Sequence, residues 1–182
     1  MKGIRSHIVL IGFMGSGKTT VGKLLAKAIN LEFIDMDSFI EKEQKSTIKE
    51  IFSNKGEAYF RKLESKALSK ILSNSKKKVI STGGGAPCFL NNMEIIKSNS
   101  ISVYLKVGSQ RLVERLIQDT QRPLIQNKTD KELLTFVKDT LRERQKDYSQ
   151  ADITVRAIDS PDSLTERITK FILKENLRKF DD

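Results

Sequence analysis

Residues 8–20 of the chain, I-V-L-I-G-F-M-G-S-G-K-T-T, constrain the fold more than any other stretch. Four apolar residues are typical of a buried strand, a glycine-rich turn follows, and Lys18, Thr19 and Thr20 open a segment with apolar residues at helical spacing. The pattern G-x-x-x-x-G-K-[ST] between a strand and a helix is that of a phosphate-binding P-loop. The stretch therefore predicts a nucleotide-binding site.

The residues of this loop have distinct expected roles. The glycines let consecutive backbone N–H groups converge on one anion, and the start of the helix adds partial positive charge. We expect Lys18 to reach the β- and γ-phosphates and the Thr19 hydroxyl to bind Mg²⁺. The alternative is a glycine-rich turn that binds nothing, and from average composition a chance match in a chain of this length has a probability of about 1% or less.

The bulk properties indicate a single domain over residues 1–182, large enough to bury a substantial core. No apolar run approaches the roughly 20 residues that span a membrane, and we expect no membrane partner. One cysteine, Cys88, suits a reducing cytoplasm. The net charge of +10 raises the possibility of a nucleic-acid partner, but the lysines are scattered at helical spacing with few aromatic residues among them. A basic solvated surface without nucleic acid is the better interpretation.

Strand and helix patterns alternate along the chain, which predicts an α/β fold of three layers: a five-stranded parallel sheet flanked by helices. The expected strands are residues 8–11, 31–34, 79–81, 101–105 and 152–155. The expected helices are residues 17–29, 38–45, 48–54, about 60–74, 91–97, 109–117, 131–148 and a last helix opened by Pro161. Ligands of such sheets bind at the carboxyl ends of the strands.

Two aspartates follow the second expected strand. Asp35 and Asp37 are two residues apart and share one side if the chain stays extended. One carboxylate can hold Mg²⁺ through water, while the other accepts a proton or hydrogen bond from a hydroxyl group. The competing interpretation is that an aspartate simply caps the helix of residues 38–45.

Gly83, Gly84 and Gly85 directly follow the third expected strand. Three consecutive glycines cost entropy without packing return, so a ligand that approaches the backbone closely is the favoured reason for them, with a tight connection as the alternative. Arg61 lies beside the apolar stripe of its helix, which suggests an inward guanidinium that binds a carboxylate. A surface ion pair with Glu57 or Glu64 competes evenly.

Three further positions are weaker candidates. Arg122 lies in a polar loop that fits a lid closing over phosphates. Arg144 and Tyr148 are four residues apart on one helix and face the same way, which a solvated pair would do equally well. The lone histidine, His7, is expected to be a solvent-side residue at the start of the first strand.

The chain resembles the shikimate kinases over nearly its full length. The matching pieces, in order, are G-F-M-G-S-G-K-T-T, D-M-D, G-E-A-Y-F-R-K-L-E, I-S-T-G-G-G, R-P-L and R-Q-K-D-Y followed by A-D-I-T-V. The resemblance implies a fold similar to the nucleoside monophosphate kinases, with a helical substrate-binding segment at about residues 35–62 and a lid at about residues 115–128. It also implies phosphorylation of the 3-hydroxyl of shikimate by ATP, with one Mg²⁺ per subunit, in a monomer.

For the acceptor, the resemblance implies that Asp37 binds the shikimate hydroxyls and is the catalytic base. It also implies that Arg61 and Arg144 bind the carboxylate of shikimate, and that Gly84, within the loop of residues 83–85, contacts the substrate through its backbone.

For the nucleotide, the resemblance implies that residues 15–20 wrap the phosphates, with Lys18 a catalytic residue. Thr19 holds Mg²⁺, and Asp35 reaches this ion through water. The resemblance also makes Arg122 the lid arginine that touches ATP and has a catalytic role. Arg115 matches the arginine that packs on adenine. The nucleotide-binding set is Gly15, Ser16, Gly17, Lys18, Thr19, Thr20, Arg115 and Arg122.

Three other functions compete with this interpretation. A kinase for another small acceptor, a nucleoside monophosphate or gluconate, would keep the P-loop and lid without needing two arginines beside three glycines. A regulatory nucleotide switch is suggested by N-K-x-D at residues 127–130, although this match falls in the lid loop rather than after a core strand. A nucleic-acid-binding module is suggested only by the net charge.

Overall fold

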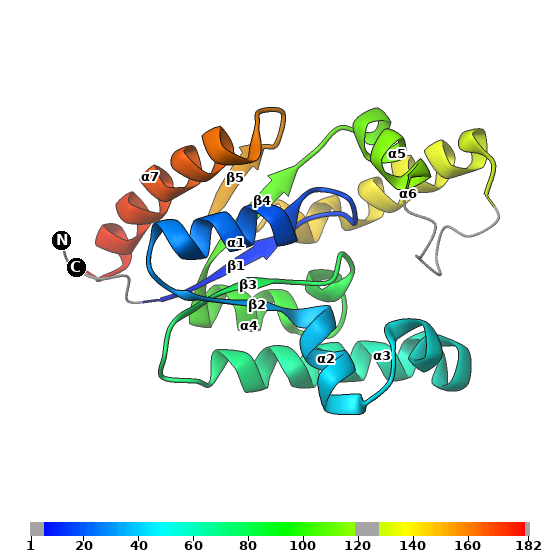
Figure 1. The fold of residues 1–182 in the computed structure, drawn as a ribbon, viewed down its shortest axis with the longest axis horizontal. Helices are drawn as coiled ribbons and strands as arrows, with labels where there is room; N and C mark the ends of the chain where they lie inside the picture. The colour runs from blue at the N-terminus through cyan, green and yellow to red at the C-terminus, as the bar shows by residue number, and fades with distance from the viewer. Residues whose placement is uncertain (1–5, 119–127, 181–182) are drawn as a thin grey trace.

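A parallel sheet lies at the centre of the molecule (Figure 1), whose computed structural model describes residues 6–118 and 128–180. The five strands are ordered β2-β3-β1-β4-β5, and all neighbours run parallel. Their bounds are β1 (His7–Ile11), β2 (Glu32–Asp35), β3 (Lys78–Ser81), β4 (Ser100–Lys106) and β5 (Ile153–Arg156). The expected five-stranded parallel sheet is confirmed.

Helices cover both faces of this sheet, as Figure 1 shows. The helices α1 (Lys18–Ala28) and α7 (Pro161–Phe180) pack side by side on one face, while α3 (Ile48–Leu72) and α4 (Asn92–Asn99) lie on the other. The remaining elements are α2 (Met36–Gln44), a short 3₁₀ helix η1 (Ala86–Cys88), α5 (Ser109–Ile117) and α6 (Asp130–Tyr148). The three-layer α/β class is therefore confirmed.

The core forms two layers because successive residues of a strand point to opposite faces. Ile8 and Leu10 of β1 pack with α1, α5 and α7, whereas Val9 and Ile11 pack with α3 and α4. All four side chains are fully buried. This burial on both faces explains why the strand is a continuous apolar run rather than an alternating one.

The strand order places a crevice at the end of β1. From β1 the chain first builds β2 and β3 on one side, then crosses to build β4 and β5 on the other. The connection that leaves β1 leads to β2, whereas the connection that leaves its neighbour β3 leads the other way to β4. Adjacent strands whose connections leave in opposite directions open a ligand crevice at this switch point. The P-loop follows β1 directly and therefore lies in the crevice.

Three local expectations are refined by the structure. Helix α2 begins at Met36 rather than Ser38, because the Asp35 side chain caps it. Gly56 interrupts α3 with φ 76° and ψ 172°, so the two expected helical pieces join at a kink. His7 is 1% exposed, so the expectation of a solvent-side residue is wrong. Its Nε2 lies 3.1 Å from the Asn74 carbonyl oxygen, and burial lowers the pKa of this imidazole.

Strand β5 is tied to β4 by a side-chain link at its start. Asp152 was expected inside the strand but precedes it, because its Oδ2 accepts hydrogen bonds from the Ser102 backbone N–H (2.8 Å) and hydroxyl (2.6 Å). The Ser102 hydroxyl in turn accepts from the Asp152 backbone N–H at 2.9 Å. The pair sets where the outermost strand of this side begins.

We expect Ser102→Ala to lower the free energy of unfolding by about 1 to 2 kcal/mol, because it removes a buried hydroxyl that satisfies both a carboxylate and a backbone N–H. Urea unfolding measures the change, with Ser98→Ala on the exposed face of α4 as the matched control. Equal stability of the two variants would contradict the importance of this link.

Candidate active site

The P-loop has the backbone geometry that its glycines predict. Gly15 (φ 76°) and Gly17 (φ 94°) adopt the left-handed region that side chains disfavour, and Gly17 caps the start of α1. The Lys18 ammonium donates to the carbonyl oxygens of Gly12 (2.8 Å) and Phe13 (2.9 Å). The lysine is thus held inside the curl of the loop, where a polyphosphate would lie against the start of α1.

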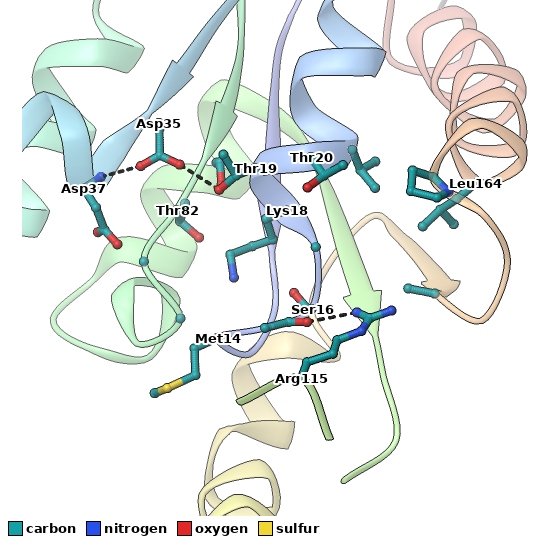
Figure 2. A pocket seen from close by; sticks show the side chains of 18 of the residues that line it. Met14, Ser16, Lys18, Thr19, Thr20, Asp35, Asp37, Thr82, Arg115 and Leu164 are labelled. Atoms are coloured by element: carbon teal, nitrogen blue, oxygen red, sulfur yellow. Dashed lines mark hydrogen bonds between the residues drawn. The ribbon is translucent and has the colours of Figure 1, made fainter. Parts of the chain in front are cut away.

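Thr19 and Asp35 form the candidate metal site. The Thr19 hydroxyl donates to Asp35 Oδ2 at 2.8 Å, a contact drawn in Figure 2. Within the described residues, no group of three or more His, Cys, Asp or Glu side chains could hold a metal ion. A hydroxyl and a carboxylate beside a P-loop nevertheless fit Mg²⁺, which takes few protein ligands and completes its shell with nucleotide phosphates and water.

The helix-cap interpretation is confirmed for Asp35, while the metal and proton roles of the two aspartates stay predictions. Asp35 Oδ1 accepts from the backbone N–H groups of Asp37 (3.1 Å) and Ser38 (3.3 Å), so it is a helix cap. Its other oxygen faces Thr19. Asp37 lies in the first turn of α2 rather than in an extended segment, and Figure 2 shows the two carboxylates pointing to different regions. Because the helix starts at this cap, Asp35 is directed towards Thr19, whereas Asp37 is carried by the first turn of α2.

A cavity of about 410 Å³ extends from these aspartates along the P-loop. At its far end it is lined by Arg115 of α5 and by Asp159, Pro161 and Leu164 at the start of α7 (Figure 2). Arg115 donates to the Gly15 carbonyl oxygen at 2.9 Å, which fixes its exposed guanidinium beside the loop. We call this space the nucleotide cavity.

Residues 83–85 have no room for side chains, because charged side chains and the P-loop backbone fill the space around them. A Cβ at Gly83 would collide with Glu64 Oε1, and one at Gly85 would lie 2.7 Å from Arg61 Nη1. A Cβ at Gly84 would lie 3.0 Å from the backbone nitrogen of Met14 in the P-loop. The glycines are therefore required by the protein's own packing, and they bring the two loops together.

Arg61 points inward, as one interpretation predicted, and it also forms ion pairs with Glu57 and Glu64, as the other predicted. The residue is 6% exposed. Glu57 Oε1 accepts from its Nε (3.1 Å) and Nη2 (2.7 Å), and Glu64 Oε2 accepts from its Nη1. Burial acts to lower the pKa of Arg61, but the two carboxylates more than offset it, and the pKa is raised. The guanidinium therefore remains charged beside the glycine loop.

The sequence predicts Glu64 only as a surface partner of Arg61, but the structure places it inside the charged cluster beside the glycine loop. It is fully buried, and burial raises its pKa to about 7 against the opposing charge of Arg61; the nearby charge of Asp37 adds to the rise. Its Oε1 is buried without a hydrogen-bond partner among the described residues. The three-residue spacing from Arg61 was visible in the sequence, but the burial that perturbs this acid was not.

Arg144 and Tyr148 of α6 are buried, so they are not a solvated pair. The Arg144 Cζ lies 5.5 Å from the Phe13 ring centroid, and its buried Nη1 has no hydrogen-bond partner within the described residues. The Tyr148 hydroxyl donates to the Gly84 carbonyl oxygen at 2.5 Å, and burial raises the pKa of this phenol. Helix α6 thus supplies a buried guanidinium with one nitrogen that lacks a partner among the described residues, and a support for the glycine loop.

These residues enclose a second cavity of about 90 Å³. It is lined by Arg61, Glu64, Arg144 and the three glycines, together with apolar side chains of α3 such as Ile48, Phe52 and Phe60. Four residues line both cavities: Met14, Asp37, Gly83 and Gly84. The second cavity therefore opens onto the phosphate end of the nucleotide cavity, with Asp37 at the junction.

The predicted lid and the N-K-x-D match lie at or beyond the edge of the described residues. Arg122 and residues 119–127 of the expected lid lie outside them. Of the N-K-x-D match at 127–130, Thr129 caps α6 through a capping box with Glu132, and Asp130 is the first residue of that helix. This position does not follow a core strand, which agrees with treating the match as coincidence.

A P-loop at the switch point of a parallel sheet, beside a small cavity with two buried arginines and an aspartate at the junction, defines the chain as a P-loop kinase of a small acceptor. The shikimate kinase family profile matches residues 14–174. The chain belongs to the shikimate kinase family.

Individual relatives agree with this assignment. The shikimate kinase of Azobacteroides pseudotrichonymphae is 48% identical over 81% of this chain and 87% of its own length. Among solved structures, the shikimate kinase of Bacteroides thetaiotaomicron matches with a TM-score of 0.87 and 40% identity, covering 92% of this chain and 98% of that one. The shikimate kinase of Acinetobacter baumannii in complex with shikimate matches with a TM-score of 0.86 and 35% identity, covering 94% and 95%.

A gluconokinase from Sinorhizobium meliloti also matches, with a TM-score of 0.64 and 16% identity over 98% of both chains. This likeness shows a shared fold alone.

None of the helices within residues 6–118 and 128–180 is both long and apolar enough to cross a membrane.

The raised pKa of Glu64 predicts a pH-dependent loss of stability. Between its ordinary value of 4.5 and about 7, the folded protein binds more protons than the unfolded chain, so stability falls as the pH rises through this window. Glu64→Gln removes the titration. We expect the variant to gain about 3 to 4 kcal/mol relative to the unmodified protein between pH 4.5 and 8, because the pKa rises from 4.5 to about 7 and one pKa unit corresponds to about 1.4 kcal/mol.

Thermal or urea unfolding across this pH range measures the difference, with Glu94→Gln on the exposed side of α4 as the control. Parallel stability profiles of the Glu64→Gln variant and the unmodified protein would mean that Glu64 titrates in the ordinary carboxyl range.

Proposed function

We propose that the chain transfers the γ-phosphoryl group of ATP to the 3-hydroxyl of shikimate, giving shikimate 3-phosphate on the route to chorismate and the aromatic amino acids. The observation that carries this proposal is the junction of the two cavities, where Met14, Asp37, Gly83 and Gly84 line both. A donor held by the P-loop and an acceptor held beside Arg61 would meet at Asp37. The shikimate complex of the Acinetobacter baumannii relative supports the choice of acceptor.

The second cavity suits a small carboxylate that carries hydroxyl groups. Arg61 and Arg144 are each less than a tenth exposed, and the Arg144 Nη1 has no acceptor among the described residues. A substrate carboxylate would supply acceptors for both guanidinium groups in charge-assisted bonds. The backbone of residues 83–85 would bind the substrate, and Asp37 would accept a proton or hydrogen bond from the reacting hydroxyl.

Transfer at this site would depend on alignment and on neutralising charge, since phosphoryl transfer needs little covalent work from the protein. The P-loop N–H groups from Gly15 to Thr20 would bind the phosphates, and Lys18 would leave its carbonyl partners for the β- and γ-phosphates. Arg115 would pack on adenine, and Arg122 would close from the lid. Mg²⁺ held by Thr19, and by Asp35 through water, would neutralise charge on the phosphates.

Several further features belong to the same proposal. The substrate-binding segment would be residues 35–62, which contain α2 and the first half of α3, and the lid would be residues 115–128. We also propose a monomer with one Mg²⁺ per subunit in the cytoplasm, where the single Cys88 would stay reduced. ATP and shikimate would be its partners, without nucleic acid or membrane.

A coupled assay for ADP release tests this function. Purified protein is incubated with ATP, Mg²⁺ and shikimate, and each component is omitted in turn. ADP formed only in the complete mixture fixes the reaction class and the acceptor together. ATP turnover independent of shikimate would keep the nucleotide site and overturn the acceptor.

We expect Lys18→Ala and Asp37→Asn each to reduce kcat by at least about a hundredfold with the fold intact, because each removes one electrostatic or acid–base contribution to the transition state. The exposed Lys23→Ala variant on α1 is the control for an added alanine. Near-normal turnover of either test variant, with circular dichroism and thermal unfolding showing a folded protein, would refute its catalytic role.

Arg61→Ala and Arg144→Ala should raise the KM for shikimate far more than the KM for ATP, by about tenfold to a hundredfold, because a lost charge-assisted bond is worth roughly 1.5 to 3 kcal/mol. Arg142→Ala, which removes an exposed arginine of the same helix as Arg144, is the control on α6. Equal changes in both KM values would mean that the arginines act on the fold rather than on the acceptor.

A further inference from the structure

An aromatic ring covers one face of the Arg61 guanidinium. The Cζ of Arg61 lies 4.2 Å from the ring centroid of Phe89, closer than its 5.4 Å to the ring of Phe60. Phe89 follows η1 and lies outside the helix that carries Arg61. No sequence pattern pointed to it, because the contact joins two residues 28 positions apart. A distance of 4.2 Å is within the range of stacking and cation–π attraction.

The edges of the same guanidinium are bound separately. Glu57 accepts from Nε and Nη2, and Glu64 accepts from Nη1. Each Nη carries two N–H donors, so one on each nitrogen remains without an acceptor among the described residues. A bidentate bond to a carboxylate needs one donor from each of two guanidinium nitrogens, and these two meet that requirement. The acids hold the fork along its edges, so tilt out of its plane is restrained by what packs on its faces, namely Gly85 and Phe89.

Glu57 alone is a weak restraint, because its side chain is 49% exposed and water competes for its oxygens. Glu64 is buried but holds a single nitrogen. A ring stacked on the face restrains the tilt that these bonds permit. It also keeps water from that side of the cation, which strengthens a charge-assisted bond to a bound carboxylate.

The backbone around Phe89 is strained and held in place. Leu90 has φ 53°, a left-handed conformation that is rare for a bulky residue, and its side chain is 64% exposed, so burial of that side chain does not compensate. The buried Asn92 donates from Nδ2 to the Ala86 carbonyl at 2.7 Å and from its backbone to the Phe89 carbonyl at 3.3 Å. The turn is thus closed in the form that directs Phe89 at Arg61.

From this geometry we infer that Phe89 is a positioning residue for the acceptor. Its ring sets the plane of Arg61 and thereby the affinity for the substrate carboxylate, without touching the reacting atoms. The inference rests on the proposed role of Arg61 in the second cavity. It adds a specificity-determining contact from the segment between β3 and α4, which also contains the three glycines.

Kinetics of Phe89 variants test the inference. Phe89→Ala should raise the KM for shikimate about three- to thirtyfold, the size of a partly buried cation–π contact, with kcat and the KM for ATP changed less than about twofold. Phe89→Leu, which keeps apolar bulk without a π face, should show a similar rise. Phe89→Tyr should restore the KM. Phe171→Leu, an exposed aromatic of α7, is the matched control.

Because the chain contains no tryptophan, Phe89→Trp also provides a single fluorophore against Arg61. We expect its emission to change on titration with shikimate and to saturate near the shikimate KM, with little response to Mg²⁺–ATP alone.

The outcomes separate the inference from the proposed function. If Arg61→Ala leaves the KM for shikimate unchanged, the proposed carboxylate contact fails. If Arg61→Ala raises this KM but Phe89→Leu matches the unmodified protein, the role of the ring alone is overturned. The role of the ring is also overturned if the emission of the Phe89→Trp variant does not respond to shikimate. Equal changes in the KM values for shikimate and ATP in Phe89→Ala would overturn it as well.

Discussion

Close packing around the three glycines after β3 is the constraint on which the rest of the site depends. A Cβ at Gly83 would collide with Glu64 and one at Gly85 with Arg61, and a Cβ at Gly84 would lie tightly against the P-loop backbone at 3.0 Å from the Met14 nitrogen. Without Cβ atoms, this loop can lie between the nucleotide cavity and the second cavity and contact both. The Tyr148 hydroxyl then holds the Gly84 carbonyl from α6. A single short stretch therefore brings together two loops and two helices.

The sequence predicted the framework well because its signals are local. Apolar runs marked the strands, and the P-loop pattern fixed the connection from β1 to α1. Parallel strands align their carboxyl ends, so Asp35, Asp37 and the glycine loop could be expected at one edge before any coordinates. The capping box of Thr47 with Glu50 at the start of α3 and the interruption at Gly56 are local features of the same kind.

What the sequence did not reveal depends on packing between distant segments. Helical spacing identified Glu57 and Glu64 as neighbours of Arg61 but not which of them would be buried. His7 could not be recognised as buried, because its partner Asn74 lies 67 residues away. Phe89 contacts Arg61 only because tertiary packing brings the segment after β3 against α3. The charged cluster is thus a tertiary feature of residues that are individually ordinary.

The same cluster explains why the fold does not select the acceptor. A gluconokinase shares the architecture at 16% identity, so the sheet and P-loop are compatible with more than one substrate. The second cavity of this chain instead contains two buried guanidinium groups, and desolvating a cation is costly unless acceptors surround it. Glu64 and Glu57 satisfy part of Arg61, while Arg144 keeps a buried donor without a partner among the described residues. A neutral polyol would leave that cation unbalanced, whereas a carboxylate balances it. Under the proposed function, acceptor choice therefore depends on the buried guanidinium donors beside the glycine loop that still lack an acceptor among the described residues.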